Sequence, residues 1–514
     1  MGSERENFSL LMGSEREKSP LLTEGERALL RGNEIGDERI SMGVSLDRVI
    51  RQVTEFKLDN GMTFIVLERP RAPVASFLIH ADVGGANEPD GQTGVAHYLE
   101  HLAFKGTTKI GTTDYQAEKP LLEKQDKLYE QYQAAKASNN TEAAAKFKAE
   151  FDIIEAEAAQ FVKQNELGKI VEQAGGVGLN AATSTDATMY FYSLPANKLE
   201  LWMSLESERF LDPVFREFYK EKQVILEERR LRTENSPIGQ MVEVFAEKAF
   251  SVHPYRRPVI GYTEDIKNLS RDDVQKFFDT YYVPSNLTVA VVGDVKAAEV
   301  KRLAQIYFGR YKAKPNPPQL QIVEPPQTQT KEVTLRLKTQ PWYLEGYHKP
   351  AMNHPDNAVY EIMGSLLSSG RTSRLYKSLV QEQQLALAAQ GFSGYPGEKY
   401  PNLMLFYAQT APGRTVDEVA AALNKEIDRL KTEPVSAAEL EQVKTQARAG
   451  LLRSLNSNMG MAFSLLDYQV KTGSWRNLFK QLDAIAAVGP DDIQRVAKAT
   501  FRPENRTVGK LLSL

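Results

Sequence analysis

An internal repeat constrains the fold of this chain more than any other feature of its sequence. Residues 272–290 match residues 491–509 without a gap, at a constant offset of 219 (491 minus 272), and seven of the 19 positions are identical. Both copies predict a helix, a turn containing proline and a strand. At 514 residues the chain is too long for one ordinary core, so two copies of one folding unit are expected.

A proline-rich segment separates the two copies. Residues 312–330 contain five prolines among glutamine and lysine, a composition that favours extended backbone over packed structure. We therefore expect a first domain at residues 53–311, a linker at 312–330 and a second, homologous domain at 331–514. Residues 1–52, in which Met-Gly-Ser-Glu-Arg-Glu occurs twice, are interpreted as a flexible leader.

The order of the predicted elements favours an α+β fold. Strands are expected at residues 62–67, 74–81, 188–194 and 287–292, in hairpin-like pairs separated by helices. This order fits an antiparallel sheet packed with helices in each domain better than a doubly wound parallel sheet.

A helical hairpin is expected as an insertion in the first domain. Residues 118–172 are rich in alanine, glutamate, lysine and glutamine, and residues 138–141 indicate a turn and the start of a second helix. The simplest interpretation is a solvated arm without chemistry, and a lid or a partner contact is the alternative.

The composition excludes several classes of function. The net charge is −3, so a nucleic-acid partner is not expected, and no apolar stretch reaches the run of about 18 residues needed for a membrane span. The chain starts without a secretory signal, which favours a soluble cytoplasmic protein, or a periplasmic one if a signal peptide has been removed. There are no cysteines, so a metal ion must be bound by histidine and carboxylate.

Two of the six histidines bracket a glutamate between residues 94 and 104. His97 and His101 are four residues apart in a helical pattern and share one face with Glu100. Two imidazoles in this arrangement can hold zinc, which lowers the pKa of a bound water toward about 7, and an adjacent carboxylate can accept the proton. A structural role is the weaker alternative, because an apolar helix face does not normally hold two histidines and a glutamate unless they pair or bind metal.

The order His-Xaa-Xaa-Glu-His reverses the common zinc-protease pattern and is typical of the inverzincins. With this motif the chain resembles the pitrilysin/insulinase family of zinc metallopeptidases, in particular its two-domain members akin to mitochondrial processing peptidase and their bacterial relatives. The resemblance extends over residues 53–514. Further stretches that carry it are residues 58–62, 104–107, 180–184, 284–288, 292–294 and 370–376.

The resemblance implies a zinc endopeptidase with Glu100 as the catalytic base and the two histidines of the motif as metal ligands. In the family the third ligand is the second of two glutamates seven positions apart. That spacing selects Glu228 here, with Glu221 orienting the site from the same helix face. Glu227 lies next to Glu228 and leaves the register open. The helical hairpin then lies between the second and third ligands, as an insertion.

The resemblance also implies a peptide substrate. The segment around Asn180 and Ala181 corresponds to a strand at the sheet edge that pairs with extended substrate in the family. Broad recognition of peptides or unfolded segments is therefore expected. An ordinary strand and turn is the alternative interpretation.

The second domain departs from the family pattern. Active members carry an arginine and, seven residues later, a tyrosine that bind substrate and stabilise the oxyanion. In this chain those positions hold Val380 and Leu387. Tyr395 is the nearby alternative donor. The resemblance therefore implies a heterodimer in which a homologous partner subunit supplies the Arg/Tyr pair.

Three other interpretations stay open. A homodimer could use other donors. A non-catalytic scaffold or assembly subunit of a larger complex also has precedent in the family, but such subunits lose the metal residues that this chain retains. The small ribosylhomocysteinase enzymes share the motif, but this chain is longer and lacks cysteine.

Overall fold

The protein contains two β-sheets, and the computed structural model describes residues 48–514. In the first sheet the strand order is β1 (Val53–Lys57), β2 (Thr63–Glu68), β6 (Leu287–Gly293), β3 (Val74–Ala81), β5 (Thr188–Pro195) and β4 (Val177–Thr183). In the second the order is β7 (Lys331–Leu337), β11 (Arg506–Ser513), β8 (Trp342–Lys349), β10 (Asn402–Thr410) and β9 (Ala386–Tyr395). Each sheet has one parallel pair, β2 with β6 and β7 with β11, and is otherwise antiparallel. The predicted α+β class with two related sheets is confirmed.

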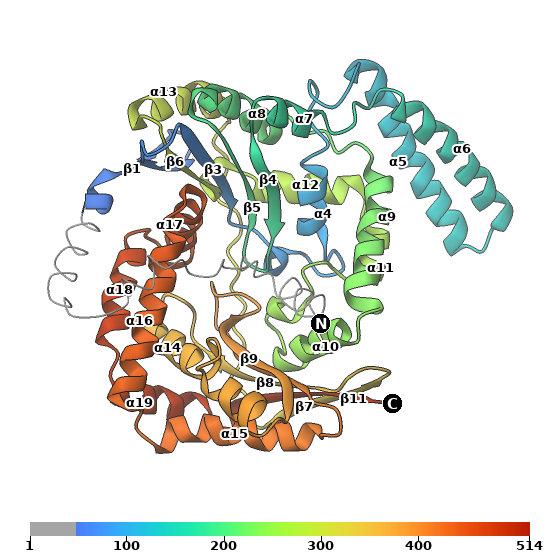
Figure 1. Ribbon diagram of the computed structural model, residues 1–514. Coiled ribbons are helices and arrows are strands. Elements are labelled where there is room, and N and C mark those ends of the chain that lie inside the picture. Colours follow the sequence, from blue (N-terminus) through green and yellow to red (C-terminus); the bar gives the residue numbers. More distant parts are fainter. Residues whose placement is uncertain (1–47) are drawn as a thin grey trace.

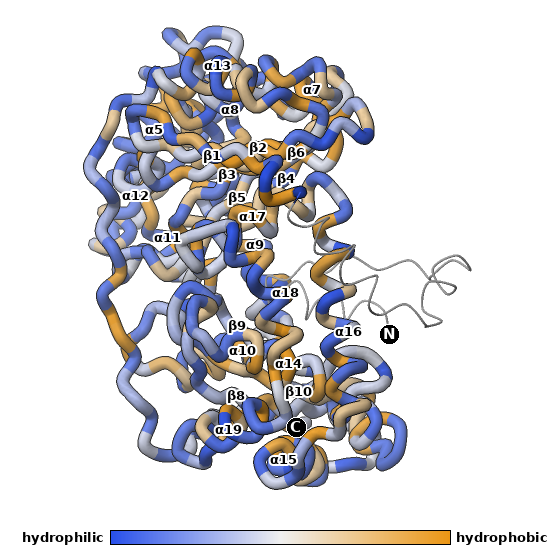
Figure 2. Tube along the Cα trace, turned by 90° about the vertical axis from the view of Figure 1, so that its left-hand side faces the viewer, coloured by the Kyte–Doolittle hydropathy of each residue, from blue (hydrophilic) through white to orange (hydrophobic). Residues whose placement is uncertain are grey.

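Helices surround both sheets (Figure 1). Those not introduced below are α8 (Leu199–Leu211), α11 (Thr263–Asn268), α13 (Ala297–Tyr307), α15 (Val416–Thr432), α16 (Ala437–Ser454) and α18 (Asn477–Ala487). In Figure 2 the apolar stretches gather at the strands of the first sheet, and the polar stretches lie on the outer turns and helices. The chain therefore follows the usual separation of a buried apolar core from a polar surface.

The internal repeat corresponds to the same helix, turn and strand in the first half (residues 53–311) and the second half (residues 331–514) of the chain. α12 (Arg271–Tyr281) leads into β6, and α19 (Pro490–Thr500) leads into β11. The buried side chain of Asn286 donates hydrogen bonds to the last carbonyl of α12 at 2.9 Å and to a carbonyl directly after β3 at 3.3 Å. The buried side chain of Asn505 donates to the last carbonyl of α19 and to a carbonyl of β8, both at 2.9 Å. The repeated asparagine therefore satisfies the same buried carbonyls in each half.

Each half also covers one face of the other half's sheet. α10 (Pro237–Ala249) packs on the second sheet, where a β-carbon at Gly346 or Gly509 would lie 3.0 Å from the ring of Phe245. α17 (Asn458–Thr472) packs on β3 and β6 of the first sheet (Figure 1). The domain boundaries predicted from the sequence do not describe this exchange, because each sheet is covered by a helix that belongs to the other half of the chain.

The helical hairpin consists of α5 (Tyr115–Ala137) and α6 (Thr141–Ala159), and it protrudes from the first half in Figure 1. Asn140 begins α6 by accepting a hydrogen bond from the Ala143 amide at 3.1 Å, as expected for a helix cap. The predicted hairpin extended to residue 172, but the structure ends it at residue 159. Residues 166–173 instead form a separate helix, α7 (Glu166–Gln173), which is held by buried apolar residues.

Most of the predicted leader, residues 1–47, lies outside the described residues. Residues 48–52 were also assigned to the leader, but they are helical, and Val49 and Ile50 pack against the core beside α17. Residues 312–330 form neither helix nor strand. Within residues 48–514, no helix is long and apolar enough to cross a membrane.

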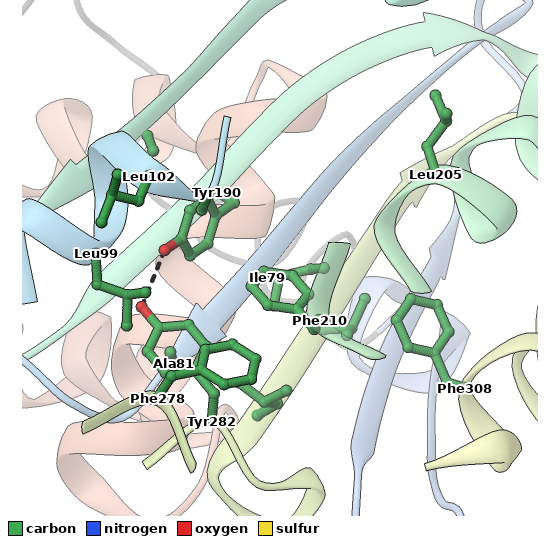
Figure 3. Packing of buried hydrophobic residues seen from close by; sticks show 14 of the residues in the cluster. Ile79, Ala81, Leu99, Leu102, Tyr190, Leu205, Phe210, Phe278, Tyr282 and Phe308 are labelled. Carbon is green, nitrogen blue, oxygen red and sulfur yellow. Dashed lines mark hydrogen bonds between the residues drawn. The ribbon is translucent and has the colours of Figure 1, made fainter. Parts of the chain in front are cut away.

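The helix that carries the His-Xaa-Xaa-Glu-His motif, α4 (Val95–Leu102), packs on the first sheet through its apolar face. Leu99 and Leu102 lie beside Tyr190 of β5, whose hydroxyl is hydrogen-bonded to that of Tyr282 at 2.9 Å (Figure 3). The sheet and its aromatic cluster thus fix the helix, and its polar side chains are left to face away from this core.

Candidate metal centre

The start of α4 is fixed by a glycine and a buried carboxylate. Gly94 has a φ of +88°, and a β-carbon there would lie 2.7 Å from the Ile260 carbonyl oxygen, so only glycine fits. The carboxylate of Glu88 accepts hydrogen bonds from the amides of Gly94 and Ala96, both at 2.9 Å. These contacts satisfy amides that the first turn of a helix leaves free.

A second helix, α9 (Phe218–Arg229), brings a carboxylate to the two histidines of α4. The Glu228 Oε2 atom lies 3.8 Å from His97 Nε2 and 3.6 Å from His101 Nε2. One donor atom from each residue lies within 4.8 Å of the others. Among residues 48–514 this is the one group of three or more such side chains that could hold a metal ion.

The neighbouring acid, Glu227, is not part of this group. Its side chain is half exposed and forms an ion pair with Arg230 at 2.5 Å. The geometry therefore favours the register in which Glu228 faces the histidines.

Glu221 orients one of the imidazoles. Its Oε1 atom lies 2.9 Å from His101 Nδ1, and its Oε2 atom lies 2.5 Å from Lys105 Nζ. A hydrogen bond at Nδ1 leaves Nε2 of His101 directed at Glu228 as a metal donor. Burial raises the pKa of Glu221, but the bonds to His101 and Lys105 outweigh it and hold the pKa below its usual value.

Glu228 is oriented in a similar way. Its Oε1 atom pairs with Arg232 at 2.7 Å, and its Oε2 atom faces the imidazoles. Burial lowers the pKa of His97 to about 3, so this imidazole stays neutral, the form in which histidine binds metal.

Glu100 lies on the same helix but outside the donor group. The Thr183 hydroxyl, at the end of β4, donates a hydrogen bond to Glu100 Oε2 at 2.6 Å. Burial raises the pKa of Glu100 above its usual value, although the bond from Thr183 acts in the opposite direction. A half-buried carboxylate of raised pKa beside a metal site is suited to accept and return a proton near neutral pH.

The strand that was predicted to bind substrate is an edge strand. Within the described residues β4 pairs with β5 alone, and it lies next to α4 (Figure 1). Asn180 is exposed on it, and Ala181 is buried. Its outer edge therefore leaves backbone groups available to an added strand.

The hairpin packs on the outward face of α9. The ring centroid of Tyr219 lies 4.3 Å from that of Tyr129 in the hairpin, and its hydroxyl donates to Asp126 at 2.7 Å. Arg271 of α12 also pairs with Asp126, at 2.6 Å. The insertion therefore supports the helix that carries Glu221 and Glu228 from the side opposite the site.

A cavity of about 330 Å³ opens beside Glu100 and His101. Its other walls come from Phe104 after α4, from Glu217 before α9 and from residues 162–167, which follow the hairpin. The cavity is therefore lined by both aromatic and charged side chains.

The two positions at which the family resemblance predicts an arginine and a tyrosine lie in the second half. Val380 is in a π-helical turn (Tyr376–Glu382) and packs against the second core. Leu387 lies exposed on β9. Tyr395 is buried among apolar residues between the second sheet and α10, so its hydroxyl is not offered to a substrate.

Sequence reasoning missed three contacts of the site, those of Thr183, Lys105 and Arg232. Arg232 stands four residues after Glu228, a spacing that indicates an ion pair on a helix. Lys105 and Thr183 lie within the short stretches that carried the family resemblance, but no local pattern indicates which carboxylates they contact.

Comparison with known proteins yields consistent matches. The family model described as insulinase (peptidase family M16) matches residues 63–134 and 157–262, and that described as peptidase M16 inactive domain matches residues 268–447. The interval between the first two segments falls within the hairpin.

Individual relatives match over most of their length. The zinc protease PqqE of Helicobacter pylori is 30% identical over 438 residues, which cover 83% of this chain and 84% of that protein. The probable mitochondrial-processing peptidase subunit beta of Schizosaccharomyces pombe is 24% identical over 459 residues, with coverages of 86% and 87%. The crystal structure of a protease from Helicobacter pylori matches with a TM-score of 0.76 and 27% identity, covering 89% of this chain and 99% of that one.

Proposed function

The chain belongs to the insulinase family (peptidase family M16), and from this membership we propose that it is the zinc-bearing subunit of an endopeptidase. Its relatives include a zinc protease and a peptidase subunit, so peptidase activity with zinc as cofactor is the function of this chain. The observation that supports the proposed centre is the convergence of His97, His101 and Glu228 from two helices.

The donor set suits zinc. Two imidazoles and one carboxylate are three protein ligands of the kinds that catalytic zinc sites use, and a fourth position is left for water or substrate. Glu221 holds the ring of His101, and Arg232 holds the second oxygen of Glu228, so both ligands are already oriented.

The proposed mechanism assigns the proton transfers to Glu100. Zinc, when bound, supplies Lewis acidity for the scissile carbonyl and for the attacking water. Glu100 takes the proton from that water and later delivers it to the leaving amine. The Thr183 hydroxyl holds Oε2 of Glu100 at 2.6 Å and so orients the carboxylate for this exchange.

The substrate is proposed to bind as an added strand along β4. Backbone pairing at Asn180 and Ala181 would place an extended peptide beside α4, and such pairing accepts many side chains. Peptides or unfolded segments are therefore the proposed substrate class.

A partner subunit is proposed to complete the site. The positions of Val380 and Leu387 offer neither an arginine nor a tyrosine, and Tyr395 is buried. Loss of one oxyanion donor typically lowers the rate about 100- to 1000-fold. We therefore propose a heterodimer with a homologous subunit that bears the Arg/Tyr pair, and a homodimer is the less favoured assembly.

The test is hydrolysis of an unstructured peptide mixture by the purified chain, alone and together with an Arg/Tyr-bearing homologue. We expect one zinc per chain and at least about 100-fold more activity in the mixture than in the chain alone. Glu100→Gln should abolish this activity, and Glu227→Gln, the matched control on α9, should retain it. Full activity of the chain alone would contradict the split site, and absence of zinc would favour a scaffold subunit.

A further inference from the structure

The turn between β4 and β5, residues 184–187, joins the catalytic helix to distant parts of the chain. Its carbonyls at Ser184 and Thr185 accept hydrogen bonds from the amides of Gly85 and Ala86, at 3.1 and 2.9 Å. A β-carbon at Gly84 would lie 2.3 Å from the Ser184 carbonyl oxygen. The turn is therefore packed closely on the segment that precedes α4.

The residue directly before this turn holds the proposed base. Thr183 donates its hydroxyl hydrogen to Glu100 Oε2 at 2.6 Å, and it is also the last residue of β4. A displacement of the turn would therefore move both the carboxylate and the end of the substrate-binding strand.

A loop of the second half is hydrogen-bonded to the other side of the turn. Asp186 is buried, and its Oδ2 atom accepts hydrogen bonds from the amides of Glu398 and Lys399 at 2.7 and 3.0 Å. Its Oδ1 atom accepts one from the hydroxyl of Tyr255. The Thr185 hydroxyl donates to the Pro396 carbonyl at 3.2 Å. The loop of residues 396–399 thus caps the turn.

The shape and charge of this loop fit that contact. A β-carbon at Gly397 would lie 2.6 Å from Asp186 Oδ2 and 2.6 Å from the Tyr255 hydroxyl, so glycine is required for the close approach. Lys399 forms an ion pair with Asp82, directly after β3, at 2.5 Å. The end of β3 and the start of β5, which are neighbours in the first sheet, are therefore both tied to the second half at this point.

We propose that the loop of residues 396–399 positions the catalytic base from the second half of the chain, through Asp186 and the β4–β5 turn to Thr183 and Glu100. Asp186 and Thr183 are positioning residues in this account, which rests on the proposed peptidase function. The second half therefore contributes to catalysis although it holds no metal ligand. The rate of the catalysed reaction falls when a carboxylate that must transfer protons moves by a fraction of an ångström.

The first test separates positioning from general stability of the contact between halves. In the assembled enzyme, Asp186→Asn and Gly397→Ala should lower kcat about 10- to 100-fold with unchanged zinc content. Thr183→Val should have the same effect, and Thr183→Ser should restore the rate because it keeps the hydroxyl.

The matched control is Arg69→Ala. Arg69 also joins the two halves, with three hydrogen bonds of 3.0–3.2 Å to carbonyls between α16 and α17, but it lies away from the turn. We expect this variant to retain kcat. Equal losses in Arg69→Ala and Asp186→Asn, or wild-type kcat in Asp186→Asn, would overturn the proposal while leaving the peptidase function intact.

A second readout does not depend on activity. Amide hydrogen exchange in residues 177–183 should become faster in Asp186→Asn and stay unchanged in Arg69→Ala. If Asp186→Asn does not fold, Thr185→Val removes only the bond to the Pro396 carbonyl and gives a milder form of the same test. Unchanged exchange in the turn variants would overturn the proposal, and an inactive wild-type enzyme would overturn the peptidase function separately.

Discussion

Two helices at equivalent places in the two halves, α4 and α14, differ in the polar side chains that they carry. α4 follows β3 along the chain and packs on β4, an edge strand of the first sheet. In the same way, α14 (Asn357–Ser368) follows β8 and packs on β9, an edge strand of the second sheet. α4 carries His97, Glu100 and His101 on its polar face, whereas α14 carries one carboxylate, Glu361, and no histidine. The scaffold is shared, and the chemistry depends on a few side chains placed on one copy of it.

The cores differ as well. Strand register places Ile79 opposite Val289 in the first sheet and Glu345 opposite the repeated residue, Val508, in the second. Ile79 and Glu345 are both fully buried. The carboxylate of Glu345 accepts hydrogen bonds from two tyrosine hydroxyls and from the side-chain amide of Asn424. At this position the second half thus has a buried polar network, and the first half has an apolar side chain.

The largest expected difference between the halves concerns zinc. His97→Ala removes one of three ligands, so zinc content and peptidase activity of the assembled enzyme should both fall to background. His354→Ala removes an exposed histidine of the second half and should change neither quantity. Metal analysis and peptide hydrolysis on the same samples check both expectations, and zinc retained by His97→Ala would break the comparison.

The second difference concerns the two glutamates. Glu100→Gln keeps the size of the side chain but removes the proton acceptor, so kcat should fall about 100- to 10,000-fold with zinc retained. Glu361→Gln on α14 should leave kcat unchanged. Steady-state kinetics on both variants decides the point, and similar losses in the two would mean that Glu100 has no special role.

Glu361 should instead influence stability with pH. Burial raises its pKa to about 7, so the folded state binds its proton more tightly than the unfolded state does. Its contribution is fully present below the unfolded pKa of about 4.5 and is lost as the pH rises through about 7. The free energy of unfolding of the wild type, relative to Glu361→Gln, should therefore fall by up to about 3 kcal/mol between pH 4.5 and 7.

Denaturant unfolding of the two proteins at several pH values measures that difference. A difference that stays flat across this range, or rises with pH, would contradict the assignment of a raised pKa to Glu361.

The smallest expected effect is one in which the halves agree. Asn286→Ala and Asn505→Ala each remove two hydrogen bonds from a buried side chain to main-chain carbonyls, so each should lower the free energy of unfolding by about 2 kcal/mol. Thermal or denaturant unfolding of both variants tests this equivalence. A neutral result for one of them would show that the repeated residue is not structurally equivalent in the two halves.

The sequence predicted those features that depend on local pattern. The strands at residues 74–81 and 287–292 lie within one residue of their predicted bounds. The motif helix and the turn between the two helices of the hairpin also follow from periodicity and turn chemistry. The end of the hairpin was misplaced, because α7 has a composition similar to that of the hairpin.

The remaining features depend on contacts between distant segments. α10 packs on the second sheet and α17 packs on the first because their surfaces are complementary in shape, as in the fit of Phe245 over Gly346. No local pattern in the sequence indicates this packing. The bond from Thr183 to Glu100 likewise joins residues 83 positions apart. The candidate ligands were found from spacing and family resemblance, and the groups that orient them could be found only in the folded chain.

Anomalous diffraction at the zinc edge from crystals of the purified protein tests the central claim most directly. We predict one peak per chain, between the imidazoles of His97 and His101 and the carboxylate of Glu228, and none in the second half. A peak held by other residues, or no peak in a chain shown to be folded, would contradict the account.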